Sequence, residues 1–157
     1  MKLFNTAGPC NPDNHYMLSA LDRNREVQHM IESNQYFVIH AARQTGKTTL
    51  LKALVREINK RGERYALYCS LESVEVITNP EKGIPGIVKV LQSVIKYSNL
   101  PEKEYFAFGI NEAYYPTLLT DVLRDYYVKL DKPLVILFDE IDSLKNGTLV
   151  SFLRQLR

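Results

Sequence analysis

Residues 41–49, Ala-Ala-Arg-Gln-Thr-Gly-Lys-Thr-Thr, combine the residue types that bind nucleotide phosphates. Successive backbone N–H groups in such a loop form a concave anion site, and the following helix N-terminus adds partial positive charge. Lys47 would reach the β- and γ-phosphates, the Thr48 hydroxyl would be a ligand of Mg²⁺, and Thr49 could donate to the α-phosphate. The predicted nucleotide contacts are Ala42, Arg43, Gln44, Thr45, Gly46, Lys47, Thr48 and Thr49.

The loop departs from the usual pattern at its first position. Ala41 stands where the pattern has Gly, and Ala lacks the freedom of Gly at positive φ. The alternative is an ordinary strand-to-helix turn with a surface Lys. The context favours a phosphate-binding loop, because the apolar run Tyr36–His40 precedes it and the amphipathic stretch Leu50–Arg61 follows it.

A second chemical motif lies at residues 133–140, Pro-Leu-Val-Ile-Leu-Phe-Asp-Glu. The continuous apolar run predicts a buried parallel strand, and such strands deliver functional groups at their carboxyl ends. Asp139 would hold Mg²⁺ through water, and Glu140 would orient or deprotonate an attacking water. We therefore expect Lys47 and Glu140 as catalytic residues and Thr48 and Asp139 as metal ligands; the alternative for the two acids is a solvated strand end.

Asp142 and Ser143 follow these acids directly. They favour a turn or the cap of the next helix over a further metal ligand.

Composition places the chain in an ordinary class. Its 157 residues suffice for one domain, and its 45% hydrophobic and 24% charged residues are typical of globular proteins. The formal net charge of +2 gives no strong polyanion signal, and no apolar run approaches a membrane span. The only cysteines, Cys10 and Cys69, are far apart in sequence, which predicts a reduced, cytoplasmic setting with Cys69 as a small buried hydrophobe.

Strand-like and helix-like patterns alternate along the chain, which predicts an α/β fold with a parallel sheet. Strands are expected at 36–40, 65–70 and 133–139. Helices are expected from a cap at Asp22 to near Asn34, at 50–61 with a cap at Gly62, from Pro85 after a loop at 79–85, at 117–130, and from Gly147 with Leu149, Phe152, Leu153 and Leu156 on its inner face. The single domain then comprises an arm and short helix (1–34), the phosphate-loop region (35–70), a helical insert (71–132) and the acidic strand with a last helix (133–157).

With both motifs in place, the chain resembles AAA-type ATPases, and in particular bacterial AAA-like ATP-binding proteins. The resemblance is carried by residues 42–50 and 138–144, with further similarity at 8–12 and 152–157. It implies the three-layer α/β/α fold of P-loop NTPases, ATP and Mg²⁺ as cofactors, and functional roles for Lys47, Thr48, Asp139 and Glu140.

The resemblance spans only the first half of the family's ATPase domain. Family knowledge places a fourth strand between the phosphate-loop strand and the acidic strand, and a fifth on the far side. Neither occurs in this sequence, so we expect a domain truncated before its fourth strand. The γ-phosphate sensor, any arginine finger and any lid would lie beyond Arg157.

Three functions are consistent with these motifs. The first is an ATPase whose hydrolysis drives a conformational change or moves a partner, with a protein partner or self-association in the full-length protein. The second is a nucleotide-dependent switch or binding module with little turnover. Glu140 favours the first, and the absence of an arginine finger favours the second. The third, a small-molecule phosphotransferase, needs an acceptor pocket and a lid that the sequence does not indicate.

Other residues have both functional and ordinary interpretations. Arg43 would contact the γ-phosphate or a neighbouring subunit, or lie in solvent; Tyr16 and Met17 would contact adenine, or pack an arm onto the domain. Arg154 and Arg157 would act in a neighbouring site, or form a solvated helix face. A set of aromatic residues would either stack on nucleic acid or simply pack within the protein: Tyr105, Phe106, Phe108, Tyr114 and Tyr115. The three histidines, His15, His29 and His40, lack the spacing of metal ligands.

Overall fold

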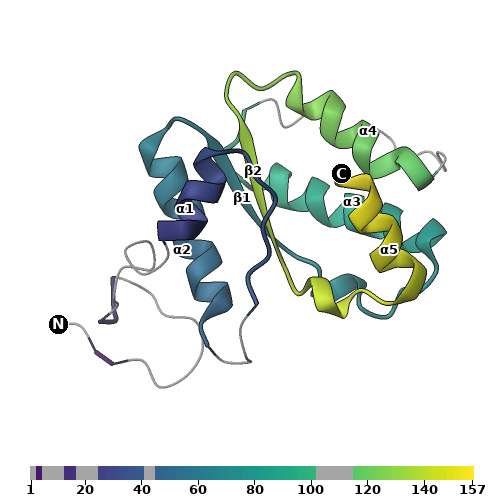
Figure 1. Ribbon diagram of the computed structural model, residues 1–157, viewed down its shortest axis with the longest axis horizontal. Coiled ribbons are helices and arrows are strands. Elements are labelled where there is room, and N and C mark those ends of the chain that lie inside the picture. The colour runs from purple at the N-terminus through teal and green to yellow at the C-terminus, as the bar shows by residue number, and fades with distance from the viewer. Residues whose placement is uncertain (1–2, 5–12, 17–24, 41–44, 102–114) are drawn as a thin grey trace.

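The centre of the molecule is a parallel pair of strands. A computed structural model describes residues 3–4, 13–16, 25–40, 45–101 and 115–157. Strand β1 (Tyr65–Ser70) pairs with β2 (Leu134–Asp139) in a register that matches Tyr65 with Leu134 and Ser70 with Asp139 (Figure 1). Both strands lie where the sequence predicts them, and they end at the same edge of the sheet.

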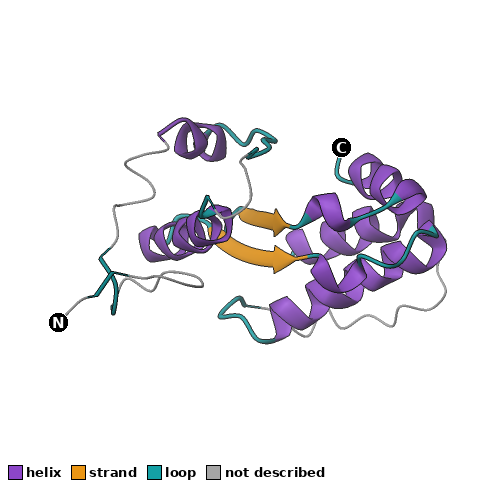
Figure 2. Ribbon diagram, turned by 90° about the horizontal axis from the view of Figure 1, so that it is seen from below, coloured by secondary structure: helices purple, strands orange, loops and turns teal. Residues whose placement is uncertain are grey.

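Helices cover both faces of this pair (Figure 2). Helices α1 (Arg25–Glu32) and α2 (Lys47–Arg61) lie on one side, and α3 (Pro80–Lys96), α4 (Tyr115–Tyr127) and α5 (Asn146–Gln155) lie on the other. Alternation along β1 explains the layers, because Ala66 and Tyr68 pack with α1 and α2 whereas Leu67 and Cys69 join the core with α3, α4 and α5. The arrangement is the predicted three-layer α/β/α architecture. No helix in the described parts of the chain is both long and apolar enough to cross a membrane.

Helix α2 ends as the sequence predicts. Gly62 has the left-handed φ of 74°, and its N–H donates to the Ile58 carbonyl at 3.3 Å. One turn earlier, the Asn59 amide donates to the Ala66 carbonyl and accepts from the Ala66 N–H, both at 2.9 Å. This side chain occupies backbone groups of β1 that the ladder with β2 leaves open, and so ties α2 to the sheet.

The prediction of a strand at 36–40 is wrong. Residues 35–40 form no strand, although their side chains alternate as in one. Phe37 and Ile39 pack against the core of α1 and α2, whereas Tyr36 and Val38 are 80% and 72% exposed. A strand also needs a backbone partner, and the sheet among the described residues consists of β1 and β2 alone.

The predicted loop at 79–85 is also wrong, because α3 already begins at Pro80. The Asn79 side chain accepts a hydrogen bond from the Glu81 N–H at 2.9 Å, so Asn79 is the cap and Pro80 occupies the first turn. Pro85 lies inside the helix, where it has no N–H to donate to the Glu81 carbonyl. Helix α4 likewise begins and ends a little earlier than predicted.

The inner face of α5 differs from the prediction at one position. Phe152 is buried and Leu149 and Leu156 pack against the core, but Leu153 is 48% exposed. Thr148 and Gln155 are buried instead. The Gln155 amide accepts from the Leu119 N–H and donates to the Tyr115 carbonyl, so it bonds the start of α4, and Thr148 donates to the Ile77 carbonyl. These polar groups face inward because they satisfy backbone groups that the core would otherwise leave unpaired.

Candidate functional site

Helix α2 begins at the Gly of the predicted phosphate loop. Gly46 has a left-handed φ of 88°, and its carbonyl accepts from the Leu50 N–H at 2.9 Å, which closes the first turn. Gly has no side chain with which to cap the helix, and the first turn, Lys47 to Leu50, contains no acid. The helix therefore has no acidic residue of its own in the first turn to interact with the partial positive charge of its N-terminus, which favours an external anion such as phosphate.

The first turn of α2 is bonded directly to the end of β2. The Thr48 hydroxyl donates to Oδ2 of Asp139 at 2.7 Å, across 91 positions of sequence. Residues predicted independently as the hydroxyl and carboxylate partners of one magnesium site are thus neighbours in space.

Two further donors hold the Asp139 carboxylate. The Tyr68 hydroxyl donates to the same Oδ2 atom at 2.9 Å, and the Glu140 backbone N–H donates to Oδ1 at 3.0 Å. Asp139 is only 5% exposed, so these bonds replace much of the water that a carboxylate would otherwise keep. Each carboxylate oxygen accepts about two hydrogen bonds, so one acceptor position, on Oδ1, remains.

Tyr68 is a site residue that the sequence interpretation missed. A Tyr in a strand is common and gives no signal by itself. The signal lies in the register, because Tyr68 pairs with Leu137, two residues before Asp139 on the same face of the sheet. Burial raises the pKa of Tyr68 to about 12, helped by its bond to Asp139 and opposed by hydrogen bonds with Thr48 and Ser70. The hydroxyl therefore stays protonated and remains a donor at neutral pH.

Glu140 occupies an unfavourable backbone conformation. Its φ of 58° is left-handed, and it is the only residue in the described parts of the chain with positive φ that is neither Gly nor Asn. Its side chain is exposed, next to the buried Asp139. Backbone strain of this kind concentrates at functional sites. The following residues, Ile141–Ser143, form a short 3-10 turn in which the Ser143 hydroxyl donates to the Leu71 carbonyl, which confirms the turn predicted for Asp142 and Ser143.

Of the other predicted residues, the structure describes some and not others. Thr45 is exposed before α2 and Thr49 is half-buried in its first turn, whereas Ala42, Arg43 and Gln44 lie outside the described residues. Met17 and residues 105, 106, 108 and 114 of the aromatic set also lie outside them. Tyr16 is 59% exposed and its ring contacts that of Phe4 at 5.2 Å between centroids.

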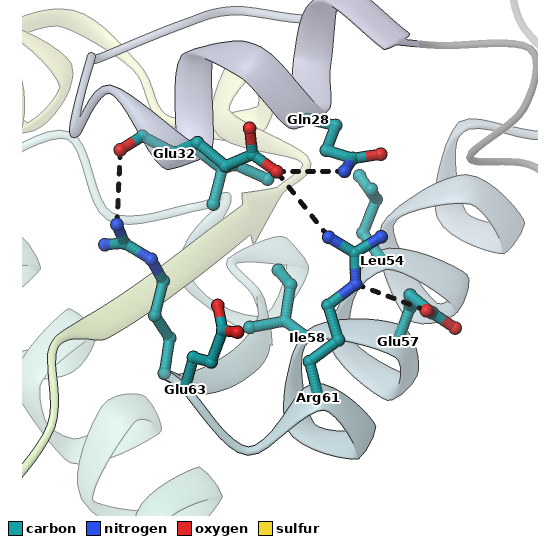
Figure 3. Close-up of a pocket in the computed structure, with 9 residues that line it drawn as sticks. Gln28, Glu32, Leu54, Glu57, Ile58, Arg61 and Glu63 are labelled. Carbon is teal, nitrogen blue, oxygen red and sulfur yellow. Dashed lines mark hydrogen bonds and ion pairs between the residues drawn. The ribbon is translucent and has the colours of Figure 1, made fainter.

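A small cavity lies elsewhere, between α1 and the end of α2 (Figure 3). Its volume is about 40 Å³, far below the several hundred Å³ of a ligand pocket. Arg61 bonds Glu32 and Glu57, and Gln28 also bonds Glu32, so four of the polar residues that line the cavity bond one another. The cavity is a gap between the packed helices α1 and α2. It is separate from the phosphate loop, because α2 runs about 20 Å from Lys47 to this end.

The donor set at the loop suits Mg²⁺. A hydroxyl and a carboxylate are hard oxygen ligands, and Mg²⁺ in nucleotide sites binds one or two protein ligands together with phosphates and water. Among the residues that the structure describes, no group of three or more His, Cys, Asp or Glu is arranged around a metal position. The protein's contribution would therefore be the Thr48–Asp139 pair, with the remaining ligands supplied by the nucleotide and water.

A three-layer α/β/α core, with a Gly-Lys-Thr helix start bonded to an acidic strand end, defines the P-loop NTPase fold. The family model described as "AAA domain" matches residues 29–157, and the chain belongs to this family. It has a nucleotide-binding domain of the ATPase type. No curated protein and no solved structure matches the chain.

Proposed function

We propose that this domain binds ATP together with Mg²⁺ and hydrolyses it, with hydrolysis coupled to conformational change. The observation that carries the proposal is the 2.7 Å bond between Thr48 and Asp139. It supports the proposal because a hydroxyl and a carboxylate, the two protein groups that this chemistry would use, are hydrogen-bonded to each other at the N-terminus of α2.

Each residue then has a separate task. Lys47, in the first turn of α2, contacts the β- and γ-phosphates, and the N–H groups of residues 45–49 bind phosphate oxygens. Thr48 and Asp139 would hold the ion, Thr48 through its hydroxyl oxygen and Asp139 through water at the acceptor position left on Oδ1. Bound Mg²⁺ supplies neutralisation of the charge on the β- and γ-phosphates.

Glu140 is the proposed base. Only its backbone N–H takes part in the bonds that hold Asp139, and its side chain is exposed, where the carboxylate can accept a proton from an attacking water. We further propose a protein partner or a second copy as the recipient of the conformational change. A cytoplasmic setting is supported by Cys69, a buried free thiol.

Calorimetric titration with ATP, in Mg²⁺ and again in EDTA, tests binding. Wild-type protein should bind MgATP, and Lys47→Ala should lose most of that affinity; an absence of heat from the wild type at millimolar MgATP would overturn the proposal. Turnover is tested by phosphate release from wild type and Glu140→Gln, with loss of release in the variant expected. Tight binding with no release from either protein would instead support the nucleotide-dependent switch.

A further inference from the structure

We propose that Tyr68 is a positioning residue that fixes the Asp139 carboxylate in the orientation that serves the magnesium ion. This inference rests on the proposed binding of MgATP and adds to it a residue from outside both sequence motifs. Tyr68 itself contacts neither nucleotide nor metal in this proposal; it acts through Asp139.

The argument begins with how the carboxylate is held. Oδ2 accepts two hydroxyl donors, from Thr48 at 2.7 Å and Tyr68 at 2.9 Å, whereas Oδ1 accepts one backbone donor, from Glu140 at 3.0 Å. Two hydroxyls approaching one oxygen from different elements fix the rotation of the carboxylate about its Cβ–Cγ bond. Oδ1 then keeps its open acceptor position in a constant direction.

Thr48 cannot do this alone, because its hydroxyl also has to serve as the metal ligand. The oxygen of Thr48 would bind the ion while its O–H still donates to Asp139, so any movement of the nucleotide would move the carboxylate with it. Tyr68 supplies a donor from the sheet that is independent of the loop.

The tyrosine ring is well placed for this role. Its backbone is fixed by the β1–β2 ladder opposite Leu137, and the Lys52 ammonium lies 4.9 Å from the ring centroid. Both neighbours belong to elements that carry the site, since Lys52 is on α2 and Leu137 is on β2. These contacts restrain the ring, and with it the hydroxyl, relative to the sheet and α2.

The same strand offers a matched control. The Tyr65 hydroxyl donates to Asp131 at 2.7 Å, and its position at the start of β1 puts it at the opposite end of the sheet from Asp139. Tyr65→Phe and Tyr68→Phe each remove one Tyr–Asp hydrogen bond from β1. They differ in whether the Asp belongs to the site.

The test measures the Mg²⁺ concentration that gives half-maximal tightening of ATP binding, by calorimetry on the full 157-residue chain. Tyr68→Phe should raise it about 10-fold, the usual effect of removing a partner of a metal ligand, while ATP affinity in EDTA stays at the wild-type value. Tyr65→Phe should match the wild type in both. Circular dichroism verifies that each variant is folded, and Mn²⁺ binding followed by electron paramagnetic resonance in the presence of ATP should repeat the shift.

The outcomes separate the two proposals. If wild type binds MgATP and Tyr68→Phe has the same Mg²⁺ requirement, the role of Tyr68 is refuted while the proposed function stands. An equal loss of ATP affinity in EDTA and in Mg²⁺ would mean a general structural role and would also refute it. If the wild type shows no Mg²⁺-dependent binding, the proposed function fails and this inference fails with it.

Discussion

Thr48 Oγ1 and Asp139 Oδ2 lie 2.7 Å apart, although 91 positions of sequence separate the two residues. The bond links the first turn of α2 to the last residue of β2, and thus connects the phosphate loop to the acidic strand. Because Asp139 is nearly fully buried, the bond acts in surroundings that screen charge less than water does. Both the stability of the domain and its affinity for a magnesium nucleotide should therefore depend on it.

Removing the Thr48 hydroxyl tests this relationship. Thr48→Val keeps the shape of the side chain but removes both the proposed metal ligand and a donor to Asp139, so MgATP affinity should fall by at least about 10-fold. Loss of a hydrogen bond to a buried carboxylate should also lower the free energy of unfolding by roughly 1–2 kcal/mol. Thr48→Ser, which keeps the hydroxyl, should stay near wild type in both calorimetry and urea unfolding. Wild-type MgATP affinity in Thr48→Val would contradict the assignment.

The strain at Glu140 predicts a trade-off between stability and turnover. A non-Gly residue in the left-handed region costs about 1 kcal/mol, and Asn tolerates that region better than Glu. Glu140→Asn should therefore raise the free energy of unfolding by up to about 1 kcal/mol while abolishing ATP turnover. Urea unfolding and phosphate release measure the two effects.

A matched control for Glu140 lies in the turn after β1. Glu75 is also exposed but has an ordinary φ of −50°, so Glu75→Asn should change the free energy of unfolding by less than about 0.5 kcal/mol. Equal effects of the two substitutions would show that the backbone at Glu140 stores no strain.

Local sequence patterns were sufficient for some parts of the fold. Tyr65–Ser70 and the acidic strand were predicted because composition is a local property: the first contains two tyrosines among apolar residues, and the second is a continuous apolar run with Val135 and Ile136. In the span 36–40, exposed and partly buried side chains alternate as in a strand. A strand also has to pair with a neighbouring backbone, and the alternation does not specify that partner. Pro85 was misread because Pro80 carries the same helix-start signal five residues earlier, and the Asn79 cap decides between them.

The site shows the same division. The Thr48–Asp139 pair was predicted because each residue belongs to a motif with a known physical task. Tyr68 belongs to no motif; its contribution arises from a ladder register and a diagonal contact across the sheet, which one strand's sequence does not reveal. Ser70 pairs with Asp139 in the ladder, and its place beside the site likewise becomes apparent only once the two strands are paired.

Two glycines of α3 should respond oppositely to the same substitution. A Cβ on Gly83 would overlap the side chain of Thr148, whose hydroxyl bonds the Ile77 carbonyl, so Gly83→Ala should lower the free energy of unfolding by about 1–3 kcal/mol. A Cβ on Gly86 would lie 3.5 Å from Val74 Cγ1, an ordinary contact. Gly86→Ala should therefore stabilise the helix by about 0.5–1 kcal/mol. Thermal and urea unfolding measure both, and a destabilised Gly86→Ala would refute the packing described for α3.

Cys69 predicts a loss of stability in alkali. Burial raises the pKa of its thiol from 9.0 to about 12, and the side chain is fully buried. The folded state keeps the proton that the unfolded state loses, so the contribution of Cys69 to stability is complete below pH 9 and declines as the pH rises toward 12. Between pH 8 and 10 the free energy of unfolding should fall by about 1 kcal/mol for this reason.

Cys69→Ala separates the titration of the thiol from its packing. The variant should be less stable at pH 7, because it loses a buried sulfur, but its stability should change less between pH 8 and 10 than that of the wild type. Tyr68, whose pKa burial raises to about 12, is present in both proteins, so its titration cancels in the difference between the two curves. Urea unfolding at intervals of half a pH unit gives both curves. Parallel curves for the two proteins would mean that the Cys69 thiol titrates alike in the folded and unfolded states. The argument that burial raises its pKa would then be wrong.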